Sequence, residues 1–146
     1  MKVLQLALVG LLGALVTLGV YTLVYAEGLS YLSNDPAGCV NCHVMRPEFE
    51  AWGNSSHKAA AVCNDCHTPH TFLGKWTVKG INGWNHSFAF TTGRYPDPIR
   101  IRPLNARVVQ ANCVACHETA VSRMTIEPAA EGVFCVRCHG NVGHER

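Results

Sequence analysis

The residues best suited to carry chemistry are cysteine pairs, each followed directly by a histidine. The pattern is C-x-x-C-H, in which two thiols can add to the vinyl groups of a haem while the adjacent imidazole binds its iron. It occurs four times and uses all eight cysteines of the 146-residue chain. The copies are Cys39, Cys42 and His43; Cys63, Cys66 and His67; Cys113, Cys116 and His117; and Cys135, Cys138 and His139. The sequence therefore predicts four covalently bound haem c groups.

Other uses of paired cysteines fit this pattern less well. A single C-x-x-C is also typical of a zinc knuckle or a redox-active dithiol. Neither alternative explains why a histidine follows every pair. Disulfide bonds are disfavoured because the cysteines of each pair are close in sequence and no unpaired cysteine remains elsewhere. Covalent haem attachment is the interpretation that uses each pair together with its histidine.

A low-spin electron-transfer haem needs a second axial ligand besides the histidine of its motif. Histidines outside the motifs nearly match that need in number; they are His57, His70, His86 and His144. We expect His57 and His144 to be distal ligands. His144 follows His139 too closely to reach the opposite face of the same haem, so it would bind a neighbouring one.

The roles of His70 and His86 are less determined by spacing. His70 lies three residues after His67, which excludes it from the opposite face of the same haem. It is a candidate ligand of a neighbouring haem, and the alternatives are a structural hydrogen bond or a haem propionate. His86 lies in the long connector between the second and third motifs, where its role does not follow from the spacing.

The first motif raises a further question, because Met45 follows His43 by two residues. Two residues span about 7 Å at most, so Met45 cannot wrap round to the opposite face of the same porphyrin. Either Met45 replaces His43 as the iron ligand on one face, or it packs against the porphyrin.

The element that precedes the motifs is an uncharged segment of 24 residues, Val3 to Ala26. At about 1.5 Å per residue, a helix of this length spans the roughly 30 Å of a bilayer core. The alternative is a cleavable signal peptide, but the segment is long for a signal-peptide core and the sequence includes Met1. Lys2 precedes the segment and acidic residues follow it, so the positive-inside rule places the amino terminus in the cytoplasm. We expect residues 1–27 to be a lipid-embedded, single-pass signal anchor in a bacterial cytoplasmic membrane.

Residues 28–146 are expected to form a periplasmic tetrahaem domain. About 120 residues for four haems leave roughly 30 for each, too few to build an ordinary side-chain core, so porphyrins must fill the interior. The pattern predicts a helix around residues 72–85, and three prolines exclude a regular helix from residues 91–103. The expected fold is mainly α-helical, with short helices near the motifs, much irregular structure and little strand.

The charge balance favours a protein partner over a nucleic acid. With Lys2 before the membrane segment, the remainder holds 11 of the 12 basic residues against 10 acidic ones, a net charge of +1. Haem propionates would add negative charge, and the sequence has no sustained basic run that would predict nucleic-acid binding. We expect the connector arginines to pair with propionates or with a protein partner. They are Arg94, Arg100, Arg102 and Arg107.

The anchor and the ordered motifs resemble the membrane-anchored tetrahaem quinol dehydrogenases of the NapC/NirT cytochrome c family. The resemblance is carried by "CVNCHVMRPEF" at Cys39–Phe49, "SSHKAAAVCNDCHTPH" at Ser55–His70, "KGINGWNHS" at Lys79–Ser87 and "CVRCHGNVGH" at Cys135–His144. With the anchor, these features cover most of the chain. The short outer domain favours the branch of the family that forms the small subunit of cytochrome c nitrite reductase.

The resemblance implies several iron ligands. It makes Met45 the ligand of the first haem, and it assigns the distal role to His57 and His144. It also implies that one haem can receive its distal ligand from a partner subunit, so neither His70 nor His86 has to fill that role.

The resemblance also implies a quinol pocket beside the first haem, with Lys79 in it. Some relatives carry an aspartate near the open side of this haem, whereas this chain has Asn85 and His86 there. His86 is therefore a candidate proton acceptor. By the same resemblance, electrons would pass from menaquinol through the haems to a periplasmic pentahaem catalytic subunit that reduces nitrite to ammonium.

The leading functional hypothesis is thus an electron-transfer subunit that oxidises menaquinol and does not itself reduce nitrite. One alternative is a quinol dehydrogenase of the same family that serves another reductase. A second is a self-contained haem reductase, which would act on a small nitrogen or sulfur oxide without any partner.

Overall fold

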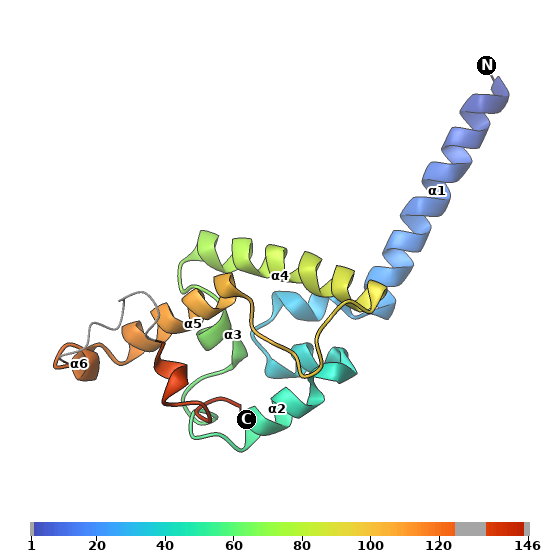
Figure 1. The fold of residues 1–146 in the computed structure, drawn as a ribbon. Coiled ribbons are helices and arrows are strands. Elements are labelled where there is room, and N and C mark those ends of the chain that lie inside the picture. Colours follow the sequence, from blue (N-terminus) through green and yellow to red (C-terminus); the bar gives the residue numbers. More distant parts are fainter. Residues whose placement is uncertain (1, 125–133, 145–146) are drawn as a thin grey trace. The chain divides into compact units, whose positions relative to one another are not determined.

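The computed structural model describes residues 2–124 and 134–144, and in these ranges the chain is helical with no β-strand. The α-helices are α1 Lys2–Tyr25, α2 Arg46–Gly53, α3 Cys63–His67, α4 Phe72–Thr92, α5 Pro103–Cys116 and α6 Glu118–Val121 (Figure 1). Short 3₁₀-helices are η1 Gly28–Leu32, η2 Pro36–Asn41, η3 His43–Met45 and η4 Cys135–Arg137. The expected fold class, mainly α-helical with much irregular structure, is confirmed.

The chain packs as two compact units, Met1–Pro47 and Glu48–Arg146. The first unit holds the apolar helix and the first C-x-x-C-H motif, and the second holds the other three motifs. The sequence-based division into an anchor, residues 1–27, and a haem domain, residues 28–146, follows membrane location and stays a prediction.

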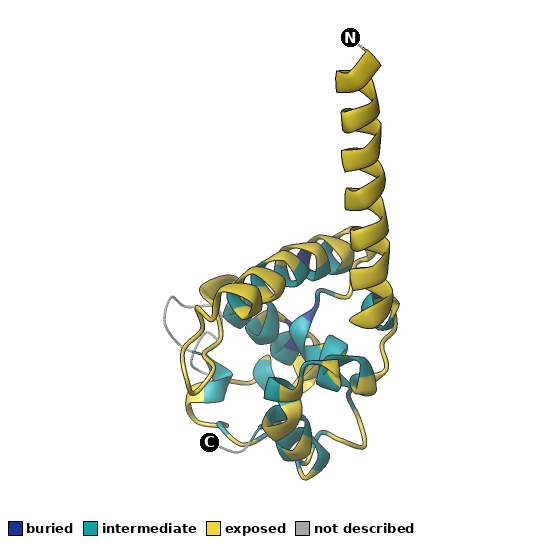
Figure 2. Cartoon of the chain, turned by 90° about the vertical axis from the view of Figure 1, so that its right-hand side faces the viewer, coloured by how far each residue is buried: buried dark blue, intermediate teal, exposed yellow. Residues whose placement is uncertain are grey.

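Helix α1 begins and ends within one residue of the predicted segment. An 18-residue window of the helix has a mean hydropathy of 2.3. None of its residues is buried, as the exposed colour along its length in Figure 2 shows. The hydroxyl of Thr22 donates to the carbonyl oxygen of Leu18 at 2.7 Å, so the helix itself satisfies this polar group. Length and composition make α1 a helix that can cross a membrane.

After α1, the chain turns sharply and packs against the first motif. Glu27 has a φ of 47°, in the left-handed region, and η1 follows it directly. The Asn41 side-chain amide donates to Ser30 Oγ at 2.7 Å. A Cβ at Gly38 would lie 2.9 Å from the Ser30 carbonyl oxygen, so only glycine permits this approach. The turn after α1 therefore holds the first motif by direct contact.

In the second unit, α3, α6 and η4 all pack on α5. Helix α4 extends to Thr92, seven residues past the predicted end. It ends at Gly93, whose φ of 66° suits glycine, and the Arg94 N–H donates to the Ala89 carbonyl oxygen at 2.9 Å. The stretch predicted to be free of helix, residues 91–103, is shorter in the structure. Residues 93–102 contain no helix, whereas Thr91 and Thr92 belong to α4 and Pro103 begins α5.

Side chains alone provide almost no core. Among residues 2–124 and 134–144, Val78 is the one buried hydrophobic residue, and the buried polar residues are Thr68 and Asn112. Figure 2 shows this as a few dark segments among intermediate and exposed ones. The sequence prediction that protein side chains do not fill the interior agrees with this burial.

Candidate haem-binding site

All eight cysteines lie in the described residues and carry free thiols. In residues 2–124 and 134–144, no group of three or more His, Cys, Asp and Glu side chains is placed to hold a metal ion. The thiols of Cys116 and Cys138 belong to exposed residues and the other six are half-buried. Each pair is thus unbridged and accessible to an added group.

The second motif is the short helix α3 itself. Its first turn is capped by Asp65, whose Oδ2 accepts a hydrogen bond from the Val62 N–H at 2.9 Å. Cys63 and Cys66 are three positions apart on one turn, so their side chains lie on the same side of the helix. His67 follows as the last helical residue. The local fold thus presents two thiols and an imidazole together.

The histidine of the second motif lies beside His144. Their ring centroids are 6.0 Å apart, with an interplanar angle of 44°. The Nδ1 of His144 lies 3.0 Å from the Glu48 carbonyl oxygen and 3.1 Å from its Oε2. Since these oxygens only accept, Nδ1 carries the proton and Nε2 keeps the lone pair that a metal would use.

Burial, followed by the nearby His144 and His86 side chains, lowers the pKa of His67 to about 4. The imidazole is therefore neutral at neutral pH, which is the protonation state that iron coordination requires.

A second pair of neighbouring histidines comes from the loop after α2 and from the end of α5. The ring centroids of His57 and His117 are also 6.0 Å apart, with an interplanar angle of 64°. The loop that carries His57 is closed by the Trp52 indole N–H, which donates to the Ala61 carbonyl oxygen at 3.0 Å. The Nδ1 of His57 is 3.2 Å from Ser56 Oγ, which again leaves Nε2 for coordination.

Both distances fit one iron between two imidazoles. A metal–nitrogen bond is about 2.0 Å, so two rings on opposite sides of one metal have centroids roughly 6 Å apart. Two pairs of histidines, distant in sequence, meet this requirement, and the side-chain core is nearly absent. The residues present therefore fit bound haem.

His70 is placed differently. Its Nε2 lies 3.0 Å from the Asp65 carbonyl oxygen and must carry the proton of that hydrogen bond. This contact is the structural hydrogen bond that the sequence left open as an alternative to iron ligation.

The first motif sets His43 and Met45 in the single 3₁₀ turn η3, in which the Met45 N–H donates to the Cys42 carbonyl oxygen at 2.8 Å. With three residues per turn, positions i and i+2 point in different directions, so the two side chains do not share one face of the turn. Met45 is half-buried whereas His43 is exposed.

The third and fourth motifs meet at α5 and η4. Burial, with the nearby thiols of Cys135 and Cys66, raises the pKa of Cys113 to about 11. Burial, Asp65 and the thiol of Cys116 likewise raise the pKa of Cys66. His139 follows η4 and is exposed. The attachment sites of the last three motifs therefore form one cluster around α5.

The residues predicted for a quinol pocket lie on α4. Lys79 and His86 are seven positions apart, so they lie on the same side of the helix, about 10 Å apart along its axis. The Nζ of Lys79 is 5.5 Å from the ring centroid of Trp76, and that of Lys75 is 5.9 Å from it. Partial burial and then the charge of Arg102 lower the pKa of His86.

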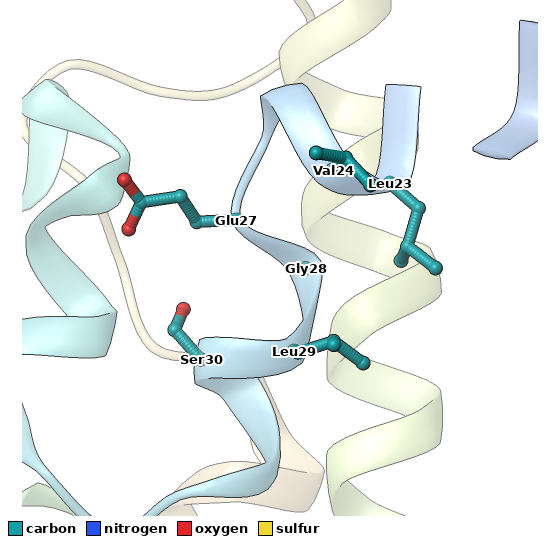
Figure 3. Close-up of a pocket in the computed structure, with 6 residues that line it drawn as sticks. All are labelled: Leu23, Val24, Glu27, Gly28, Leu29 and Ser30. Carbon is teal, nitrogen blue, oxygen red and sulfur yellow. The ribbon is translucent and has the colours of Figure 1, made fainter. Parts of the chain in front are cut away.

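An apolar hollow adjoins the end of α1. It is lined by Leu23, Val24, Glu27, Gly28, Leu29 and Ser30. Figure 3 shows the side chains of Leu23 and Leu29 on one side of the backbone and those of Glu27 and Ser30 on the other. Since Ser30 also bonds Asn41 of the first motif, the hollow lies next to that motif.

The sequence reasoning missed several residues that hold the motifs. Asn112 is buried between the second and third motifs, and Gln110 contacts the fourth. The hydroxyl of Tyr31 lies 3.4 Å from Cys42 Sγ in the first motif. A position directly before a cysteine was the only signal for Asn112, and the sequence held none for Gln110 or Tyr31.

Comparison with known proteins places these features in a family. The model of the NapC/NirT cytochrome c family, N-terminal region, matches residues 1–146. NrfH of Wolinella succinogenes, a cytochrome c-type protein, is 40% identical over 137 residues, covering 86% of this chain and 77% of the relative. Cytochrome c nitrite reductase subunit NrfH of Nitratidesulfovibrio vulgaris is 37% identical over 131 residues, covering 89% of this chain and 80% of the relative.

A more distant relative and a solved structure point to the same family. NapC of Escherichia coli is 22% identical over 167 residues, covering 96% of this chain and 80% of the relative. A crystal structure of a cytochrome c nitrite reductase NrfHA complex bound to the HQNO inhibitor contains a chain that is 34% identical to this one. The match has a TM-score of 0.70 and covers 93% of this chain and 91% of the chain in the complex. The motifs, the apolar helix and these similarities lead to one assignment: the chain is a membrane-anchored, covalent haem c protein that belongs to the NapC/NirT cytochrome c family.

Proposed function

We propose that this chain is the menaquinol-oxidising electron-transfer subunit of a nitrite reductase complex. The observation that carries the proposal is its similarity to two NrfH proteins over most of each chain, together with the similarity to a chain of an NrfHA complex. That complex was bound to HQNO, a quinol analogue. The chain would take electrons from menaquinol and pass them to a periplasmic multihaem subunit that reduces nitrite to ammonium.

The alternatives are weaker on these observations. A quinol dehydrogenase that serves another reductase is disfavoured because identity is 40% and 37% to the NrfH proteins but 22% to NapC of E. coli. A self-contained haem reductase predicts turnover of a nitrogen or sulfur oxide by the purified chain alone. An electron-transfer subunit predicts no such turnover.

Location follows from α1. The helix would span the bacterial cytoplasmic membrane once, in contact with lipid, with the amino terminus in the cytoplasm and the haem domain in the periplasm. Lys2 at the first position of the helix and Glu27 two residues after its end support this orientation. The first motif, held by the turn after α1, would then lie near the membrane, where a quinol arrives.

Four haem c groups would be held by the eight cysteines, each pair forming two thioether bonds. When bound, the haems supply one-electron redox chemistry. The protein supplies their axial ligands: His67 with His144 at the second motif, and His117 with His57 at the third. At the fourth motif His139 is the proximal candidate, and its exposure supports a distal ligand from the partner subunit.

The distal role of His144 predicts a change of spin state. We expect His144→Ala to convert one low-spin haem to a high-spin haem, because the ring opposite His67 is lost. Electron paramagnetic resonance of the oxidised protein measures this conversion. His70→Ala is the matched control, because the His70 ring bonds the Asp65 carbonyl oxygen. A low-spin spectrum that His144→Ala leaves unchanged would contradict the pairing.

At the quinol site, the ammonium group of Lys79 would hydrogen-bond a quinol oxygen and His86 would accept a proton. Their position on one side of α4 supports a common site, and the lowered pKa of His86 keeps its ring able to accept a proton at neutral pH.

Replacement of Lys79 tests the proposed function. Loss of a hydrogen bond from a charged group should lower kcat/KM for menaquinol about tenfold or more in Lys79→Leu. Reduction of the haems by an artificial dye should stay unchanged. Lys75→Leu is the matched control, since both lysines lie over the same Trp76 ring. Equal effects of the two substitutions would remove Lys79 from the quinol site, and parallel loss of dye reduction would indicate misfolding.

A further inference from the structure

Asn112 is a buried polar side chain whose amide nitrogen contacts three main-chain carbonyl groups. It is 8% exposed and lies in the last turn of α5, directly before Cys113 of the third motif. Its Nδ2 lies 2.9 Å from the Asp65 carbonyl oxygen, 3.0 Å from that of Cys66 and 2.9 Å from that of Thr68. An amide nitrogen has two protons, so one of these three contacts is shared.

These carbonyl groups belong to the end of the second motif. Helix α3 ends at His67, and the last carbonyl groups of a helix have no partner within it. Asn112 supplies partners on both sides of His67, to Cys66 before it and to Thr68 after it. The backbone that orients the His67 imidazole is therefore fixed by a side chain that adjoins the third motif.

Helix α5 contacts the fourth motif by a similar bond. Gln110 Oε1 accepts a hydrogen bond from the N–H of Cys135, at 2.8 Å. Cys135 is the first cysteine of the fourth motif. One helix that itself carries the third motif thus hydrogen-bonds the motifs on both sides of it in the sequence.

We propose that Asn112 is a positioning residue that sets the separation and orientation of the second and third haem sites, with Gln110 doing the same for the third and fourth. A shift of α3 relative to α5 would take this donor from the carbonyl groups of Cys66 and Thr68, which is energetically costly because the Thr68 contact is buried and the Cys66 contact partly so. Asn112 binds neither haem nor substrate in this role and acts through the backbone of His67. The proposal depends on haem attachment at these motifs, and its consequence for electron flow rests on the proposed function.

Asn112→Asp tests the proposal, because aspartate has the same shape but its carboxylate cannot donate to three carbonyl groups. We expect four haems by haem content and, in hydrogen exchange, a rate about tenfold or more higher at the amides of Cys66, His67, Thr68 and His70. The electron paramagnetic resonance signal of the His67 and His144 pair should shift, while that of the first haem should not. None of these measurements uses quinol or nitrite, so they stand whether or not the chain oxidises menaquinol.

Asn105→Asp is the matched control, since Asn105 lies on the same helix and its Nδ2 donates to Asn82 Oδ1 at 3.0 Å, away from the motifs. It should leave exchange at the amides of Cys66, His67, Thr68 and His70 unchanged, and likewise the signal of the second haem. If Asn112→Asp does not accumulate, Asn112→Ser removes the same contacts without adding charge and should give the same shifts. Unchanged exchange and an unchanged signal in a four-haem Asn112 variant would overturn the proposal, as would equal effects from Asn105→Asp.

Discussion

A chain that is synthesised without covalent haem attachment is expected to lack a folded structure beyond α1. Full burial of one apolar side chain contributes about 1.5–3 kcal/mol, whereas ordering each backbone residue costs about 1–2 kcal/mol. The described residues contain a single buried hydrophobic side chain, Val78, so side-chain burial cannot offset the ordering of the domain. Haem contacts would have to supply the difference.

Replacement of all eight cysteines by serine, or synthesis without haem attachment, provides the test. Proteolysis and hydrogen exchange should show residues 28–146 open throughout, while α1 remains in the membrane. Loss of one motif alone, by substitution of Cys135 and Cys138, should leave the rest of the domain partly protected. A haem-free chain with a cooperative thermal transition would contradict the account.

Met45, rather than His43, is expected to bind the iron of the first haem. The two side chains leave one 3₁₀ turn in different directions, and Met45 is the more buried of the two. Covalent attachment needs Cys39 and Cys42 but does not need the adjacent histidine on the iron. A thioether is a soft ligand that raises the reduction potential, which suits the first electron acceptor of a quinol.

Because no second residue is assigned to the opposite face of the first haem, this haem should give a high-spin ferric signal in the electron paramagnetic resonance spectrum of the oxidised protein. That signal should be separate from the signal of the fourth haem, whose second ligand is proposed to come from the partner subunit. We expect Met45→Leu to change the signal of the first haem and no other. Met124→Leu is the control, because Met124 is an exposed residue after α6. A first haem that is low-spin, or whose high-spin signal Met45→Leu leaves unaltered, would contradict the assignment of Met45 as its ligand.

Much of the site could be predicted from sequence because its chemistry is local. The thiols and the adjacent imidazole of each motif are fixed by spacing, and the bounds of α1 follow from an uncharged run. The extent of α4 was predicted too short, although Gly93 was available as an end signal. The local sequence pattern thus predicts where haem is attached and which segments are helical better than it predicts the residue at which a helix ends.

The pairing of histidines could not be predicted, because it depends on tertiary contacts between distant segments. The sequence indicated that His144 binds a haem other than that of His139, but not that its ring lies against His67. Asn112 was missed for the same reason, since its partners are carbonyl groups of the main chain, which leave no mark in a sequence.

Reduction of the haems by menaquinol tests the central claim most directly. The purified chain, in liposomes that contain menaquinol, should show haem reduction in its visible absorption spectrum. Addition of nitrite should reoxidise these haems only when a multihaem nitrite reductase subunit is also bound, with ammonium as the product. Failure of menaquinol to reduce the haems, or reoxidation by nitrite with the chain alone, would contradict the assignment of this protein as an electron-transfer subunit.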